Sequence, residues 1–272
     1  MMIQGLAYND QVRFFLFDST NVVEEINQLI KPEPVAIDVL GRSMSITAIM
    51  AHMLKGDEKL STTLDCSGPL NCVHCFANSK GYVKAGINNA YDNLEGLNIK
   101  QAIGNGSLRV IKNLKMKEPF VGEVELIQSD VVNDYAYYFV KSEQVPTAIC
   151  CNVLINDDHS IKKSGALLIQ LLPEADEEII TKLEEVVKNF DSIAQLLLDN
   201  TKEEILMKIF DDKYTILKEY DVQYKCDCSK ENFINGLQML GNDDLISIKK
   251  EKTIEVVCEY CKKTYNINTG EI

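Results

Sequence analysis

Two cysteine pairs near the C-terminal end decide how the chain is organised: Lys225-Cys226-Asp227-Cys228 and, after residues 229–257, Cys258-Glu259-Tyr260-Cys261. Two close pairs joined by a loop of moderate length can bring four sulfurs to the corners of a tetrahedron. Zinc takes that geometry with thiolates, at Zn–S distances of about 2.3 Å. The spacing therefore predicts one zinc ion held by Cys226, Cys228, Cys258 and Cys261.

The same cysteines permit a static role or a redox role. Most four-cysteine zinc sites are structural and hold together domains too small for a core of their own. The single residue between Cys226 and Cys228 also places two sulfurs where a disulfide could form, through a strained small ring. Such a site could exchange its metal for disulfides, and the two interpretations are not exclusive.

Composition limits the class of protein. A chain of 272 residues can bury a sizeable core and is long enough for two domains. The start of the chain lacks a signal-peptide pattern, and no stretch approaches the roughly 20 apolar residues of a membrane span. Nine cysteines without an export signal predict a reducing cytoplasm. The net charge of −13 argues against nucleic acid as a partner.

Residues 1–173 mix strands with a few helices. Strands are expected at 10–17, 60–64, 73–77, 82–87, 108–114, 120–127, 147–155 and 164–172, and helices after Asp18, over about 34–55 with a possible break at Gly41, and over 130–141. The regular βαβ repeat of a doubly wound fold is missing. The pattern predicts an α+β domain with a largely antiparallel sheet.

Residues 174–221 change in character to a charged, helical pattern. Ile179, Ile180, Leu183 and Phe190 lie on one predicted stripe, and Thr201-Lys202-Glu203-Glu204 is a capping box. Short helices are marginal in water, so these must dock on another part of the protein. We predict a helical linker of marginal stability.

Residues 222–272 form the predicted zinc domain. A helix is expected from Ser229 to Leu240, with short strands at 245–249 and 255–257. About fifty residues hold too little apolar surface to fold reliably alone. Metal binding would then supply on the order of 10 kcal/mol of folding free energy.

Several motifs spread over the chain resemble the heat shock protein 33 family of redox-regulated holdase chaperones. They are residues 54–60 (LKGDEKL), 68–70 (GPL), 136–139 (AYYF), 142–146 (SEQVP) and 168–173 (LIQLLP), together with Cys-x-Cys followed by Cys-x-x-Cys. The resemblance implies a substrate-binding and dimerisation domain (1–173), a linker (174–221) and a redox-switch domain (222–272).

The resemblance also implies a mechanism. The reduced, zinc-bound form would be a weak chaperone. Oxidation would form the disulfides Cys226–Cys228 and Cys258–Cys261, release zinc and unfold the linker. The protein would then dimerise and hold unfolding client proteins without ATP, as a chaperone and not an enzyme.

Five further cysteines depart from the family's switch motif: Cys66, Cys72, Cys75, Cys150 and Cys151. Cys72-Val73-His74-Cys75 is itself Cys-x-x-Cys, which keeps open a thiol oxidoreductase or a metal site with Cys66 and His74. In a strand, however, Cys72 and Cys75 would face opposite sides, so packed or surface thiols are the simpler interpretation. The other alternative is an interaction module with a permanently structural zinc site.

Overall fold

The computed structural model describes residues 1–173, 175–188 and 192–272. Glu174, where we placed the start of the linker, and Phe190, which we placed on its apolar stripe, lie outside the described residues. The chain forms two compact units, Met1–Tyr224 and Lys225–Ile272.

Two sheets form the framework of the larger unit. Sheet A has the order β10-β1-β2-β9-β8, and sheet B has the order β11-β5-β4-β3-β6-β7. Every pairing is antiparallel except that of β11 with β5. The strands of sheet A are β1 (Met2–Ala7), β2 (Val12–Asp18), β8 (Thr147–Ile155), β9 (Ile161–Leu171) and β10 (Tyr214–Tyr220). Those of sheet B are β3 (Lys59–Cys66), β4 (Cys72–Asn78), β5 (Tyr82–Ile87), β6 (Gly106–Asn113), β7 (Phe120–Glu125) and β11 (Gln223–Tyr224).

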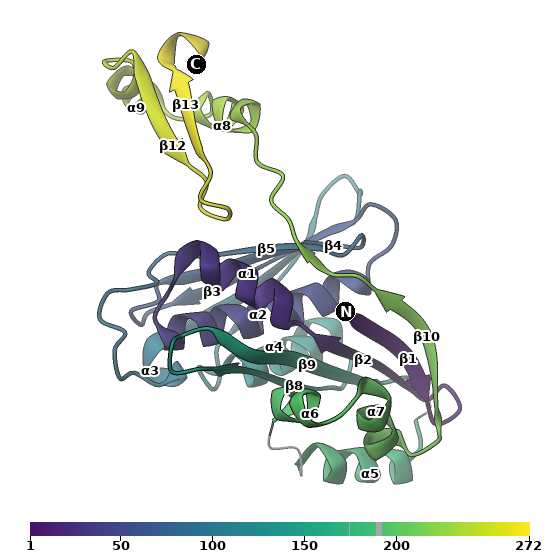
Figure 1. Cartoon of the computed structure of the whole chain (residues 1–272). Helices are drawn as coiled ribbons and strands as arrows, with labels where there is room; N and C mark the ends of the chain where they lie inside the picture. The colour runs from purple at the N-terminus through teal and green to yellow at the C-terminus, as the bar shows by residue number, and fades with distance from the viewer. Residues whose placement is uncertain (174, 189–191) are drawn as a thin grey trace. The chain divides into compact units, whose positions relative to one another are not determined.

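Helices fill the space between the sheets and cover the outer face of sheet A (Figure 1). The inner layer is α1 (Thr20–Ile30), α2 (Pro34–His52) and α4 (Val131–Tyr138), which continues into a π-helical turn, η1 (Phe139–Glu143). The short α3 (Ile99–Ile103) precedes β6, and the outer layer is α5 (Glu177–Lys188), α6 (Ile193–Asp199) and α7 (Lys202–Phe210). The predicted α+β class with largely antiparallel sheet is confirmed.

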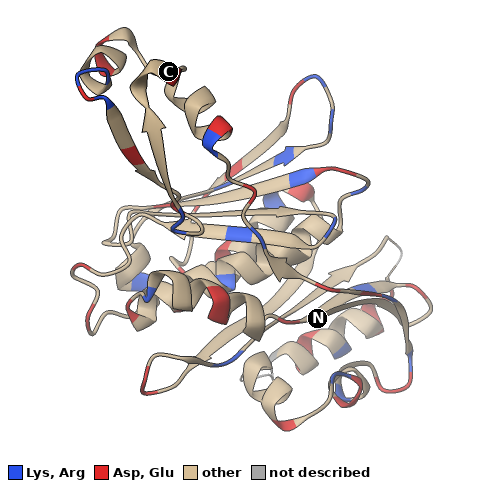
Figure 2. Ribbon diagram, turned by 45° about the horizontal axis from the view of Figure 1, so that its top comes forward, with Lys and Arg blue, Asp and Glu red and all other residues tan. Residues whose placement is uncertain are grey.

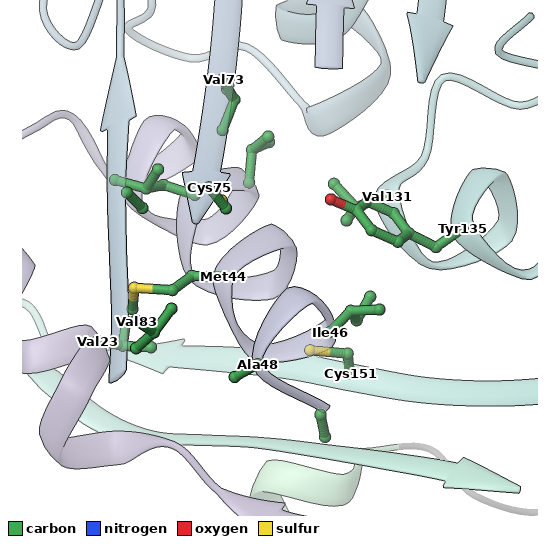
Figure 3. Packing of buried hydrophobic residues seen from close by; sticks show 14 of the residues in the cluster. Val23, Met44, Ile46, Ala48, Val73, Cys75, Val83, Val131, Tyr135 and Cys151 are labelled. Atoms are coloured by element: carbon green, nitrogen blue, oxygen red, sulfur yellow. The ribbon is translucent and has the colours of Figure 1, made fainter. Parts of the chain in front are cut away.

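Helix α2 is the centre of the main core. It is buried on almost every face, because sheet A lies on one side of it and sheet B on the other. Figure 3 shows Met44, Ile46 and Ala48 among side chains contributed by both sheets. By length and composition α2 could cross a membrane, but 78% of its apolar window is buried inside the structure, as in a core helix.

Gly41 does not break α2, contrary to our expectation. A Cβ atom there would lie 2.9 Å from methyl groups of both Val23 and Val153. The glycine therefore allows α1 and β8 to approach the helix closely, and its low helix propensity is overridden by this packing.

A second core lies on the outer face of sheet A. Phe14, Leu16, Leu167 and Ile169 point away from α2 and are covered by residues of the outer helices. Phe210 of α7 is fully buried there and stacks on Phe14, with ring centroids 4.7 Å apart. The described part of the predicted linker thus packs with residues 1–173 in one unit, and its independent release stays a prediction.

The linker is not helical to its end. Residues 214–220 form β10, which pairs with β1 at the edge of sheet A. Tyr214, Ile216 and Tyr220 are its half-buried positions and are separated by even numbers of residues, a strand pattern that we did not weigh against the charged composition. Its partner β1 was also absent from our predictions.

The smaller unit contains α8 (Lys230–Leu237), α9 (Asn242–Ile248), β12 (Thr253–Val257), β13 (Thr264–Asn268) and a 3₁₀ turn, η2 (Thr269–Glu271). The expected strand at 245–249 is wrong, because this segment is the helix α9. Gly241 is its N-cap residue, and Asp243 and Asp244 in its first turn favour a helix start. Short apolar runs are ambiguous between helix and strand.

Charge is distributed over the outside of the molecule. Figure 2 shows acidic and basic residues interspersed along the loops and outer helices of the larger unit. Arg109 pairs with Glu123 across β6 and β7, and Lys163 pairs with Asp18 across β9 and β2. The excess of acidic residues is therefore spread over the surface.

Candidate metal centre

The second cysteine pair lies on the turn between β12 and β13. Cys258 donates its backbone N–H to Lys263 O at 2.9 Å and accepts from Lys262 N at 2.8 Å. Lys262 takes a left-handed conformation, with φ at 56°, which closes the turn. Cys258 is 2% exposed, and Cys261 is half-buried.

The first pair lies between β11 and α8. Ser229 caps α8 by accepting a hydrogen bond from Asn232 N at 3.1 Å, which places Cys228 directly before the helix. Phe233 of α8 packs against Tyr265 of β13, with ring centroids 5.3 Å apart. This contact brings the first pair to the turn that carries the second.

The four sulfurs converge on one point. All four Sγ atoms lie within 4.8 Å of one another. The Cys226–Cys258 distance is 3.7 Å and the Cys228–Cys261 distance is 3.4 Å. Ligands at about 2.3 Å from a tetrahedral ion would be about 3.8 Å apart, so this set can hold a metal ion, as the spacing predicted.

Tyr265 belongs to the site, although our sequence analysis assigned it no role. Its hydroxyl donates to Cys228 O at 3.0 Å and lies 3.3 Å from Cys228 Sγ. Only its place four residues after Cys261 could have indicated it. It orients the segment that carries Cys228.

The cysteine thiols of the cluster differ in pKa. Burial opposes ionisation of Cys228, but hydrogen bonds from Tyr265, Cys261 and Cys226 overcome it and lower the pKa of Cys228 to about 7. Burial and the hydrogen-bonded sulfurs of Cys228 and Cys258 raise the pKa of Cys226 and of Cys261. Cys228 is therefore the position where the first thiolate forms, and a cation would favour thiolates at all four.

The smaller unit has little else to hold it together. Its buried residues, all within 225–272, are Cys258, Ile267 and Thr269, and neither α8 nor α9 contributes one. The sulfur cluster therefore takes the place of an apolar core.

The other cysteines do not assemble a second cluster. Among the described residues, the one group of three or more possible metal ligands is the C-terminal four. Cys72 is half-buried on the outer face of β4, and Cys75 is fully buried against α2 (Figure 3), so they point to opposite sides, as predicted. Cys151 lies in the main core, and Cys150 packs beside the second core.

Fold and site together define a two-unit α+β protein whose small unit carries a four-cysteine cluster that can hold a metal ion. The family model described as Hsp33 protein matches residues 1–268. The 33 kDa chaperonin of Bacillus subtilis (strain 168) is 35% identical over 279 residues, covering 100% of this chain and 96% of the relative. The 33 kDa chaperonin of Staphylococcus aureus (strain Newman) is 34% identical over 280 residues, covering 100% and 96%.

A solved structure agrees with these relatives. The 33 kDa chaperonin (heat shock protein 33 homolog) from Thermotoga maritima has a TM-score of 0.88 and 29% identity, and covers 99% of this chain and 95% of that one. The chain belongs to the Hsp33 family. The resemblance predicted from the motifs is confirmed, and the comparisons support a chaperone.

Proposed function

We propose that this chain is a redox-regulated, ATP-independent holdase whose switch is the cluster Cys226, Cys228, Cys258 and Cys261. The observation that carries the proposal is the convergence of four sulfurs within 4.8 Å in a unit almost without an apolar core. In the reduced form these thiolates would hold one zinc ion, which stabilises the smaller unit and keeps the protein weakly active.

Oxidation would convert the ligands into Cys226–Cys228 and Cys258–Cys261 disulfides. Two molecules of peroxide take four electrons from the four thiolates and, with four protons, become four molecules of water. The ligand set is then lost, and with it about 10 kcal/mol of metal-supplied folding free energy. The two short sulfur–sulfur distances, Cys226 to Cys258 and Cys228 to Cys261, join one cysteine pair to the other. The disulfide pairing therefore has to be established by mapping the disulfides of the oxidised protein.

The outer helices supply the second part of the proposal. They cover Phe14, Leu16, Leu167 and Ile169 on sheet A, a contiguous apolar surface. If α5, α6 and α7 are released when the smaller unit loses its metal, this surface becomes available to unfolding client proteins and to a second copy of the chain. We place the active protein in the cytoplasm, as a homodimer when oxidised, with neither nucleic acid nor membrane as a partner.

The test is a paired measurement on the reduced, zinc-loaded protein. After addition of peroxide, zinc release is followed with a chromophoric chelator, and holding is followed as suppressed aggregation of a thermally unfolding client. About one zinc per chain should leave, and holding should rise with it. Cys258→Ser should lose zinc without oxidant, whereas Cys150→Ser, outside the cluster, should behave like the unmodified chain.

Two outcomes would reject the proposal. Zinc that stays bound, or leaves with no gain in holding, would make the cluster a structural staple in an interaction module. A thiol oxidoreductase acting through Cys72 and Cys75 is disfavoured, because Cys75 is fully buried on the opposite face of β4 from Cys72.

A further inference from the structure

A cysteine and a histidine lie side by side on β4, in the larger unit. Cys72 and His74 are two residues apart in the strand and therefore project from the same face of sheet B. Cys72 Sγ lies 3.5 Å from His74 Nδ1, and both side chains are half-buried. A thiol in this position can donate its proton to the imidazole, which is the arrangement that activates cysteine nucleophiles.

The remaining cysteines outside the cluster have unreactive surroundings. Burial raises the pKa of Cys66, Cys75 and Cys151 to about 12 and that of Cys150 to about 11. Cys66 donates a hydrogen bond to Leu64 O, and Cys151 donates one to Arg42 O. Since the thiolate is the reactive form, these four are poor nucleophiles.

We propose that Cys72 and His74 form a second oxidant-reactive site, separate from the four-cysteine cluster, that reacts with a small uncharged hydroperoxide. Cys72 Sγ passes its proton to His74 Nδ1 and attacks one peroxide oxygen. The S–O bond forms as the O–O bond breaks, and the leaving hydroxide takes the proton from the imidazolium. The balance is one thiol and one hydrogen peroxide giving one sulfenic acid and one water, with the sulfur oxidised and the peroxide reduced.

Charges of both signs lie on the face of sheet B that carries the pair. Asp65 is the cross-strand partner of Cys72 on β3, and directly opposed side chains project from the same face. The chain as a whole carries a net charge of −13. Arg109 and Lys84 also lie on this face of sheet B, so neither sign of charge dominates beside the pair, and hydrogen peroxide is the probe because it carries no charge.

The test measures sulfenic acid residue by residue in the reduced, zinc-loaded full-length chain. Hydrogen peroxide is added with dimedone, and labelled peptides are quantified by mass spectrometry. Cys72 should be labelled at least ten times faster than Cys66, a half-buried thiol of the same hairpin. His74→Gln should slow the labelling of Cys72 about tenfold and leave that of Cys66 unchanged.

A pH profile of the unmodified chain provides a second readout, which does not depend on the folding of a variant. Alkylation of Cys72 by iodoacetamide should begin to rise at a lower pH than that of Cys66, because a proton acceptor beside the thiol favours the thiolate. Labelling of Cys72 no faster than that of Cys66, or a profile that rises only in the ordinary thiol range of about pH 8.5, would overturn the proposal. Because each thiol is read from its own peptide, the result is independent of zinc release and holding.

Discussion

At the scale of single residues, Tyr265 connects the backbone of the first cysteine pair to the strand after the second. Its hydroxyl is within hydrogen-bond distance of both the carbonyl and the sulfur of Cys228. Partners of this kind orient metal ligands, and their loss typically weakens metal binding 10- to 100-fold. The ring itself packs on Phe233, so the hydroxyl can be removed without removing the packing.

We therefore expect Tyr265→Phe to weaken zinc binding by about tenfold while the smaller unit still folds. Competition with a chromophoric chelator measures the affinity, and Tyr214→Phe in the larger unit is the control. Unchanged affinity in Tyr265→Phe would show that the hydroxyl does not orient Cys228.

His52 is a second residue with a defined consequence. Its Nδ1 lies 2.7 Å from Ala48 O and must donate to it, which leaves Nε2 unprotonated and buried next to the Tyr220 ring. Burial, helped by the charge of Lys218 and opposed by the Ala48 hydrogen bond, lowers the pKa of His52. The unfolded chain therefore binds a proton at His52 at a higher pH than the folded protein does.

Stability contributed by a neutral His52 is present above its unfolded pKa of about 6.5 and is lost as the pH falls below that value. We expect the free energy of unfolding of the larger unit to drop between pH 7.5 and 5.5, and the drop to be smaller in His52→Gln. Urea titrations at both pH values measure it, with His159→Gln as the exposed control. Equal drops in all three proteins would contradict the assignment.

At the scale of elements, α7 docks on sheet A through one aromatic side chain. Phe210 is fully buried against Phe14, and Tyr8 meets it edge to face. Met207 of the same helix is 49% exposed. Substituting alanine for each residue in turn therefore distinguishes the effect of lost docking, at Phe210, from the effect of changed helix propensity, at Met207.

Phe210→Ala should destabilise the docked helices by about 3–5 kcal/mol. Hydrogen exchange should then rise in 193–210 while α2 stays protected, and holding should appear in the reduced protein if the covered surface binds clients. Met207→Ala should change neither. Faster exchange without holding would place the client surface elsewhere.

At the scale of the whole molecule, the two units have different sources of stability. The larger unit buries α2 between two sheets, whereas the smaller unit relies on four sulfurs. Removing a structural metal removes folding free energy only from the part that depends on it.

A strong zinc chelator under reducing conditions should therefore raise hydrogen exchange across 225–272 and leave β2 and α2 protected. Exchange followed by mass spectrometry, before and after zinc is added back, measures this. A cooperative loss of protection in both units would show that the larger unit depends on the metal as well.

Elements with local signals can be predicted from the amino-acid sequence alone. The capping box at Thr201 and Glu204, the hairpin turn before Gly81 and the 3.6-residue periodicity of α1 are each encoded within a few residues. The same holds for the four sulfurs, since cysteine spacing alone limits the geometries that they can share. The family motifs could be identified in the sequence because each consists of a few consecutive residues.

Features that depend on residues far apart in the chain become visible only in the folded protein. β1 and β10 become strands because each supplies hydrogen bonds to the other, although the paired residues Met2 and Tyr220 are 218 residues apart in the chain (220 − 2). Gly41 stays helical because Val23 and Val153 occupy the space of its missing side chain. Tyr265 meets Cys228 only because the fold brings together two segments 37 residues apart, and no local pattern in the sequence carries that information.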